Sequence, residues 1–160
     1  MVIRPEIHRN ISHDIDLFLI IQKMSEDKLH ALSRADIEKA SLALFNMIGF
    51  INFTLAKKFP VLQRKALSVR DVINALEFIE VGLPLFAEEG EAQLAKAVFH
   101  AVSLVIMDGL CLGIDVAGDR QKEQISSHCD DYLDMILRDI CWPGWKRASN
   151  ALNGEFTNTD

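Results

Sequence analysis

The sequence lacks the long apolar run that a transmembrane helix requires. Its richest apolar runs, at residues 17–21 and 104–107, are short, whereas a spanning helix needs about 18 consecutive apolar residues. The first ten residues contain no apolar core of signal-peptide length. We therefore expect neither a membrane partner nor secretion. The sequons that begin at Asn10 and Asn52 are then expected to be chance matches.

Cysteine is scarce, with three residues in the chain: Cys111, Cys129 and Cys141. Their wide spacing matches no zinc pattern, and their odd number argues against a closed disulfide framework. We expect buried, reduced thiols and no metal site.

Catalytic signatures are also absent. The chain contains no G-x-x-x-x-G-K-[ST] phosphate loop, no H-E-x-x-H zinc motif and no G-x-S-x-G nucleophile motif. His100 lies in a mostly apolar stretch, where we expect a hydrogen-bonded structural histidine rather than a ligand. Asp130, Asp131 and Asp134 are expected to form a solvated helix face. The net charge of −6 also argues against direct nucleic-acid binding, which requires phosphate neutralisation. We expect no catalysis by this chain alone.

Helical periodicity dominates what is present, and no alternating strand pattern competes with it. The sequence predicts an all-α bundle of about five helices. Two start signals are specific: Ser33 precedes Asp36 by three residues, and Ser68 precedes Asp71 by the same interval, as in a capping box. The expected helices cover residues 12–32 with a break near residue 25, 33–59, 68–81, 88–106 and 119–140. Residues 1–143 would form the domain, followed by a polar tail, residues 144–160, poorly ordered beyond about residue 151.

Charge is distributed in blocks along the middle of the chain. Residues 40–70 contain no Asp or Glu, whereas residues 71–95 contain no Lys or Arg. One interpretation is two solvated surfaces of opposite sign. The other is that the basic block faces an anion such as a nucleotide phosphate, with Arg70 beside the free N–H groups of a helix start. The basic residues are Lys57, Lys58, Arg64, Lys65 and Arg70.

The segments 67–71 and 100–110 both match motifs of one known family. The segment 67–71, Leu-Ser-Val-Arg-Asp, is similar to the S-[IV]-R-D-[LI] helix in the lid of midasin-type AAA+ modules. The segment 100–110, which begins at His100 and includes Asp108, resembles the family's H-G-A-x-x-V-F-L-D-G-[LI] helix and turn. The likeness extends over about residues 14–140. Ala75, Ala101 and Cys111 depart from it: they replace a frequent tryptophan and two glycines.

The resemblance implies a helical lid that closes over ATP and Mg²⁺ held by an α/β core outside this chain. Arg70 would match the arginine, called sensor 2, that reaches the γ-phosphate, and Asp71 would cap its own helix or orient Arg70. The implied partners are that core, neighbouring modules of the same polypeptide and precursors of the large (60S) ribosomal subunit. Midasin remodels these precursors in the nucleus, that is, in the nucleolus and the nucleoplasm. The lid alone would bind no cofactor.

Two alternatives stay open. The chain could be a stand-alone helical protein-interaction module without a nucleotide, or the lid of a bacterial-type MoxR relative, which would share the arginine helix but not the second motif. A phosphate loop about a domain length upstream in the parent reading frame would distinguish a lid from an interaction module.

Overall fold

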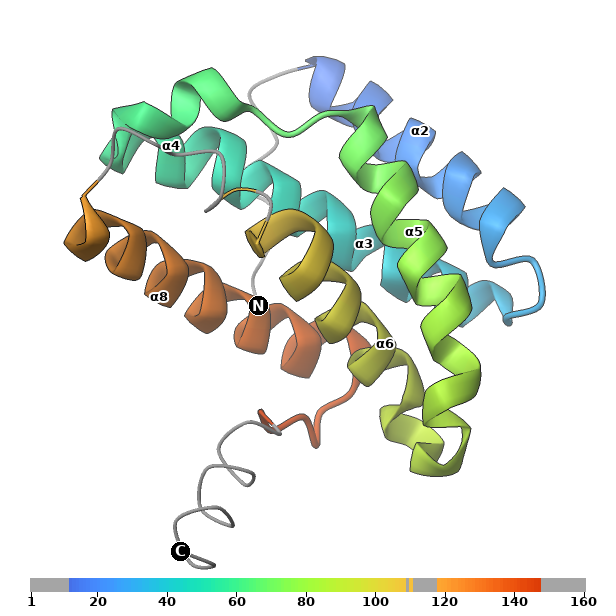
Figure 1. The fold of residues 1–160 in the computed structure, drawn as a ribbon. Helices are drawn as coiled ribbons and strands as arrows, with labels where there is room; N and C mark the ends of the chain where they lie inside the picture. Colours follow the sequence, from blue (N-terminus) through green and yellow to red (C-terminus); the bar gives the residue numbers. More distant parts are fainter. Residues whose placement is uncertain (1–11, 109, 111–117, 148–160) are drawn as a thin grey trace, which may run out of the picture.

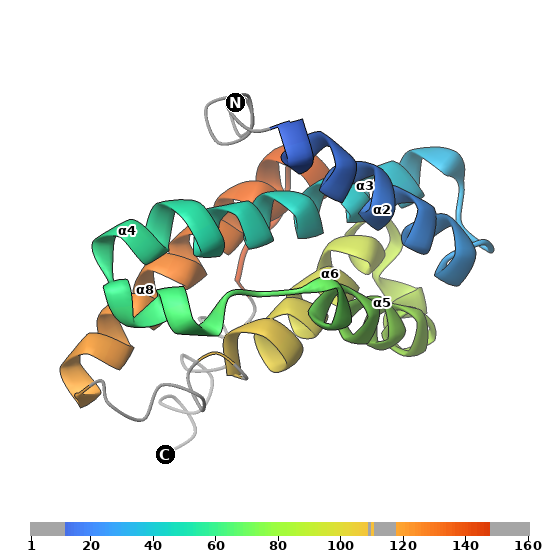
Figure 2. The same ribbon diagram turned by 90° about the horizontal axis from the view of Figure 1, so that it is seen from above.

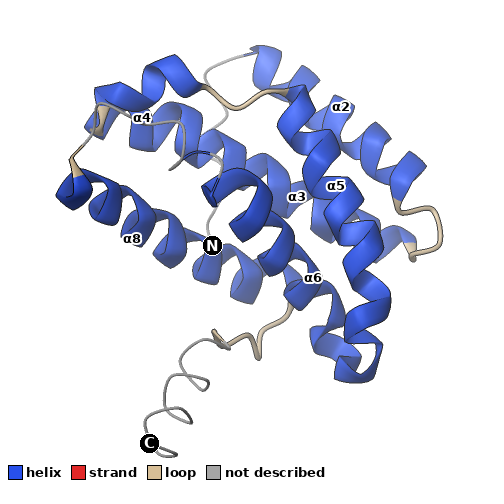
Figure 3. Cartoon of the chain, viewed as in Figure 1, coloured by secondary structure: helices blue, strands red, loops and turns tan. Residues whose placement is uncertain are grey.

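The computed structural model describes residues 12–108, 110 and 118–147. These residues form helices joined by short turns, with no strand among them, so the all-α prediction is confirmed (Figure 3). The helices, several of which follow one another without a break, are α2 (Ser12–Lys28), α3 (Arg34–Gly49), η1 (Phe50–Leu55), α4 (Ala56–Lys58), η2 (Pro60–Lys65), α5 (Val69–Gly82), η3 (Leu83–Ala92), α6 (Gln93–Ala101), η4 (Val102–Met107), α8 (Asp119–Ile136) and η5 (Leu137–Cys141).

The centre of the bundle is a continuous rod made of α3, η1 and α4. It begins where the Ser33 hydroxyl accepts the N–H of Asp36 at 3.1 Å, and it ends two residues before Pro60. By length and composition Arg34–Lys58 could cross a membrane, although 67% of its most apolar window is buried inside the protein. The lengths of the apolar runs in the sequence did not predict this membrane-length helix, because small and polar residues interrupt its apolar residues. Such burial is what the core helix of a bundle shows.

Other helices surround this rod. The helices α2 and α8 both pack against α3, and α5 pairs with α6 in a hairpin that contacts α2 (Figures 1 and 2). The buried core joins all of these elements, with Ile48, Leu76, Val98 and Leu133 at 2% exposure or less. Burial of such side chains contributes about 1.5–3 kcal/mol each, and this core is therefore the main source of stability.

The start of α6 differs from the prediction. We expected a helix from Glu88, but the acidic residues lie in the 3₁₀ segment η3, and α6 begins at Gln93. Gly90 has φ of 62° and ψ of −123°, a conformation that other residues rarely adopt, so the backbone turns there. The Gln93 amide then donates to the carbonyl of Leu83 at 2.7 Å, which ties the two ends of η3 together.

The expected break near Ser25 is also wrong. Ser25 is fully buried inside α2, and its hydroxyl donates to the carbonyl of Ile21 at 2.8 Å. A serine that bonds back along its own helix satisfies its hydroxyl without interrupting the helix. The first helix therefore continues to Lys28.

The described residues include three π-helical stretches: η1 lies inside the central rod, η4 follows α6, and η5 ends the rod that begins with α8. At η1 the ring of Phe50 stacks on Tyr132 of α8, with centroids 4.0 Å apart and planes inclined by 5°. Burial raises the pKa of Tyr132 well above its usual range, so the phenol stays neutral at physiological pH. This stack holds the rod against α8.

Packing continues past the predicted domain boundary at residue 143. Trp145 is 2% exposed, and its indole N–H donates to Asp134 Oδ1 at 3.0 Å. The folded unit therefore includes residues 144–147, which the sequence analysis assigned to the tail. The expectation of poor order beyond residue 151 concerns residues outside those described.

Candidate functional site

Arg70 lies on the first turn of α5 and is exposed to solvent. Within the described part of the chain its guanidinium makes no ion pair with an acidic side chain. A first turn also leaves backbone N–H groups without helical partners. The helix start therefore offers a fixed positive charge for an anion outside this chain.

The adjacent carboxylate of Asp71 is occupied by the helix cap. The backbone N–H of Ser68 donates to Asp71 Oδ2 at 2.8 Å, and the Ser68 hydroxyl lies 3.3 Å from the same oxygen. The predicted capping box at this position is confirmed. Asp71 shapes the turn that carries Arg70.

Asn52 anchors the chain just before this turn. Its amide nitrogen donates to the carbonyl of Leu67 at 3.1 Å, and its amide oxygen accepts the N–H of Leu67 at 2.8 Å. The two bonds join η1 to the extended segment that leads into α5. Sequence reasoning treated Asn52 only as a chance sequon, because nothing in the sequence reports a pairing across 15 positions.

The structure does not bring the basic block together. Lys57 and Lys58 end α4, whereas η2 and the extended segment carry the chain across the molecule to α5 (Figures 1 and 2). Lys58 Nζ lies 3.1 Å from His128 Nε2 on α8. Lys57 and Lys58 therefore end a different helix, apart from the start of α5, since proximity in sequence did not become proximity in space. The side chains of Arg64 and Lys65 lie outside the described part.

Two of the α8 aspartates, Asp130 and Asp134, pair with Arg147, whereas Asp131 is exposed. Arg147 Nη2 lies 2.7 Å from Asp134 Oδ2 and donates to the backbone carbonyl of Asp130 at 2.8 Å. Burial raises the pKa of Asp130, and the charge of Arg147 opposes that shift. The expectation of a solvated face holds for Asp131 but is wrong for Asp134, whose carboxylate is bound by Arg147; Asp130 pairs with Arg147 and its side chain is 37% exposed. No His, Cys, Asp and Glu cluster suited to a metal occurs among the described residues.

His100 is exposed rather than hydrogen-bonded. Its ring stacks on Phe86, with centroids 5.1 Å apart and planes inclined by 21°, and meets the edge of Phe99 at 5.6 Å. Aromatic packing across the α5–α6 hairpin explains its position, so no ligand is required there.

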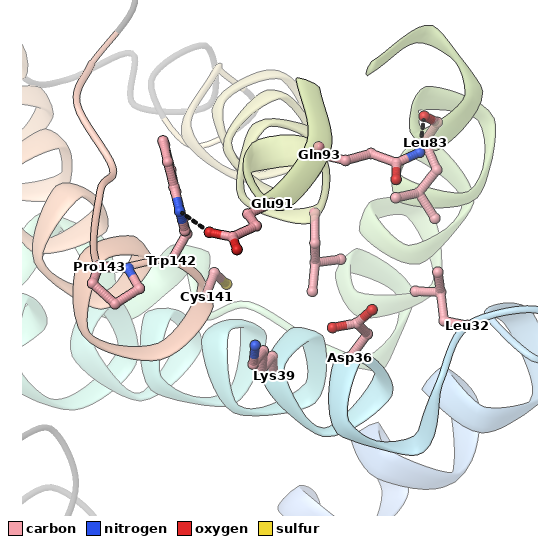
Figure 4. A pocket seen from close by; sticks show the side chains of 11 residues that line it. Leu32, Asp36, Lys39, Leu83, Glu91, Gln93, Cys141, Trp142 and Pro143 are labelled. Atoms are coloured by element: carbon pink, nitrogen blue, oxygen red, sulfur yellow. Dashed lines mark hydrogen bonds between the residues drawn. The ribbon is translucent and has the colours of Figure 1, made fainter. Parts of the chain in front are cut away.

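A cavity of about 390 Å³ lies between the start of α3, η3 and the end of η5 (Figure 4). Asp36, Lys39 and Glu91 place charged groups around it, and the indole N–H of Trp142 donates to Glu91 at 3.3 Å. Burial raises the pKa of the Cys141 thiol to about 12. Because the thiolate is the nucleophile, Cys141 is inert at neutral pH and the cavity holds no evident catalytic group. Cys141 and Cys129 are both buried, as predicted, and Cys111 lies outside the described residues.

A second hollow, here named the α5–η4 groove, is predominantly apolar and has a volume of about 440 Å³. It lies on the outer side of the α5–α6 hairpin, and sequence reasoning did not identify it. Its walls come from two helices that are antiparallel neighbours. The groove is lined by Asn74, Glu77, Phe78, Val81, Leu104 and Val105.

Comparisons with known proteins add no assignment: no family model, no curated protein and no solved structure matches this chain. The interpretation of both surfaces, the Arg70 turn and the α5–η4 groove, therefore depends on their own chemistry.

Proposed function

We propose that this chain is the helical lid of a midasin-type AAA+ module. The lid would close over ATP and Mg²⁺ bound to an α/β core outside the chain. The observation that carries this proposal is Arg70, exposed at the start of α5 and without an acidic partner in the described residues. In the lid, Arg70 would contact the γ-phosphate.

The local chemistry supports that role. A guanidinium stays charged and offers several donors in a fixed plane, which suits phosphate oxygens. The positive end of the α5 dipole adds to the attraction. The negative charge of Asp71 would oppose this attraction for an anion, but the Asp71 carboxylate accepts the Ser68 N–H at 2.8 Å. One arginine cannot hold a nucleotide alone, so the core would supply most of the affinity.

The bound nucleotide would control the angle between the lid and the α/β core, because α5 of the lid would contact the nucleotide on that core. ATP that bridges core and lid would hold them at one angle, and loss of the γ-phosphate would release that constraint. The lid would pass this rotation to the neighbouring module. In the whole protein the consequence would be remodelling of large-subunit ribosomal precursors in the nucleus.

The parent protein provides the first test. Its reading frame should encode a phosphate loop about a domain length before residue 1, and that module should hydrolyse ATP. The isolated chain should show no turnover above a buffer blank. A reading frame without a phosphate loop, or turnover by the isolated chain that survives Arg70→Ala, would contradict the proposal.

A second candidate is a helical protein-interaction module without a nucleotide. The observation that favours it is the exposed apolar groove between α5 and η4. This alternative predicts that Arg70→Ala changes nothing in the parent protein, whereas changes in the groove abolish its association with a partner.

A further inference from the structure

The α5–η4 groove carries unusually exposed apolar side chains. Phe78 is 49% exposed, Val81 69% and Leu104 50%, and Leu85, just beyond α5, is 77% exposed. Exposed apolar residues that occur singly are normal, whereas a continuous patch marks an interaction site. Here four of them gather along one hairpin.

Their spacing suits a helical ligand. Phe78 and Val81 stand one turn apart on the same face of α5, and Leu85 follows them in the 3₁₀ segment η3. Leu104 of η4 supplies the opposite wall of the groove. A furrow between two helices with an apolar floor is the usual receptor for the apolar face of a third helix.

The hairpin that carries the groove is predominantly acidic. Glu77 lines the groove, Glu80 and Glu88 are exposed on the same hairpin, and Asp108 is exposed one turn beyond Leu104. Arg70, one turn before Asn74 on α5, is an exposed cation on this hairpin. Residues 71–95 contain no Lys or Arg.

Two lysines do contact this acidic segment. Lys28 pairs with Glu77 at 3.3 Å, and Lys96 pairs with Glu89 at 2.8 Å. Each pairs with one carboxylate, and the exposed Glu80, Glu88 and Asp108 still outnumber Arg70, so the hairpin around the groove remains acidic.

We propose that the α5–η4 groove binds an amphipathic helix of another protein, with apolar anchors about one turn apart and Lys or Arg beside them. A second copy of this chain is disfavoured, because a two-fold contact would place one acidic rim against the other. Anionic lipid headgroups would be repelled for the same reason. This inference goes beyond the nucleotide role and does not depend on it.

The test uses a fluorescently labelled leucine–lysine peptide of about 16 residues, long enough to form a helix, with leucines at i, i+3, i+4 and i+7. Anisotropy titration of the full chain should show saturable binding. Val81→Ser combined with Leu104→Ser should weaken that binding about tenfold or more, as for central apolar anchors. Leu19→Ser, an equally exposed leucine on α2, is the matched control and should bind as the wild type does.

A peptide with the same leucines but glutamate in place of lysine should bind at least about tenfold more weakly, because like charges meet at the rim. Arg70→Ala should not weaken peptide binding, because it removes a cation from the hairpin, and this separates the inference from the lid proposal. If the double variant does not fold, Val81→Ser alone gives the comparison.

The proposal is overturned if the groove and Leu19 variants respond alike, or if both peptides bind equally. It is also overturned if sedimentation shows a dimer that the groove variant dissociates, or if the wild type binds anionic vesicles through the groove.

Discussion

Cys129 and Cys141 illustrate how burial decides the reactivity of a side chain. Both thiols lie in the core, at 1% and 6% exposure, and burial raises the pKa of Cys141 to about 12. The folded state thus favours the neutral thiol. The stability that Cys141 contributes is complete below its unfolded pKa, near 9, and is lost as the pH rises from there to about 12.

In a Cys111→Ser background, the folded protein should resist a thiol-specific dye at pH 8. Only the thiolate reacts, and neither remaining thiol is accessible. Absorbance at the dye wavelength should rise after addition of urea, to two thiols per chain. Rapid labelling of the folded protein would contradict the burial of at least one of these two thiols.

At the scale of elements, the connection into α5 depends on a single amide. Replacement of Asn52 by Leu should lower the free energy of unfolding by about 1–3 kcal/mol, because the Leu67 N–H and carbonyl lose their partners. Urea denaturation measures this loss. Asn74→Leu, at an exposed position of α5, is the control and should change stability by less than about 0.5 kcal/mol. Equal effects of the two substitutions would mean that the Asn52 bonds do not stabilise the segment.

Some elements could be predicted from sequence because their signals are local. The starts at Ser33 and Ser68 follow from a cap residue and an acid three positions later. The start of α6 was missed, since the conformation of Gly90 is not evident from its neighbours. Periodicity indicates only which face of a helix is buried, and not which helices pack together. It therefore could not predict that Arg147 contacts Asp134 or that Lys57 lies apart from Arg70.

At the scale of the whole molecule, residues 144–147 close the bundle. Two truncations isolate their contribution: one removes residues 144–160 and the other removes residues 148–160. The longer truncation should be less stable than the shorter by roughly 3–5 kcal/mol, as for loss of a buried tryptophan side chain. Thermal melting of both proteins measures the difference. Equal melting would contradict the structural role assigned to Trp145.

The two proposals concern different turns of α5. Arg70 marks its start, and the apolar groove runs along its later turns. A lid needs both kinds of surface, since it must contact a nucleotide at one place and protein at another. The account thus predicts separable effects: Arg70→Ala should affect the nucleotide response, and changes at Val81 should affect association.

The most direct test compares Arg70→Ala in the isolated chain and in the intact parent module. Charge-assisted contacts contribute roughly 1.5–3 kcal/mol, so ATP affinity or turnover of the module should fall by about one to two decades. Melting of the isolated chain should change by less than about 0.5 kcal/mol, because Arg70 is exposed. Lys57→Ala, which removes an exposed cation away from α5, should alter neither. If Arg70→Ala unfolds the isolated chain while ATP turnover of the module is unchanged, Arg70 is a structural residue and the lid assignment is wrong.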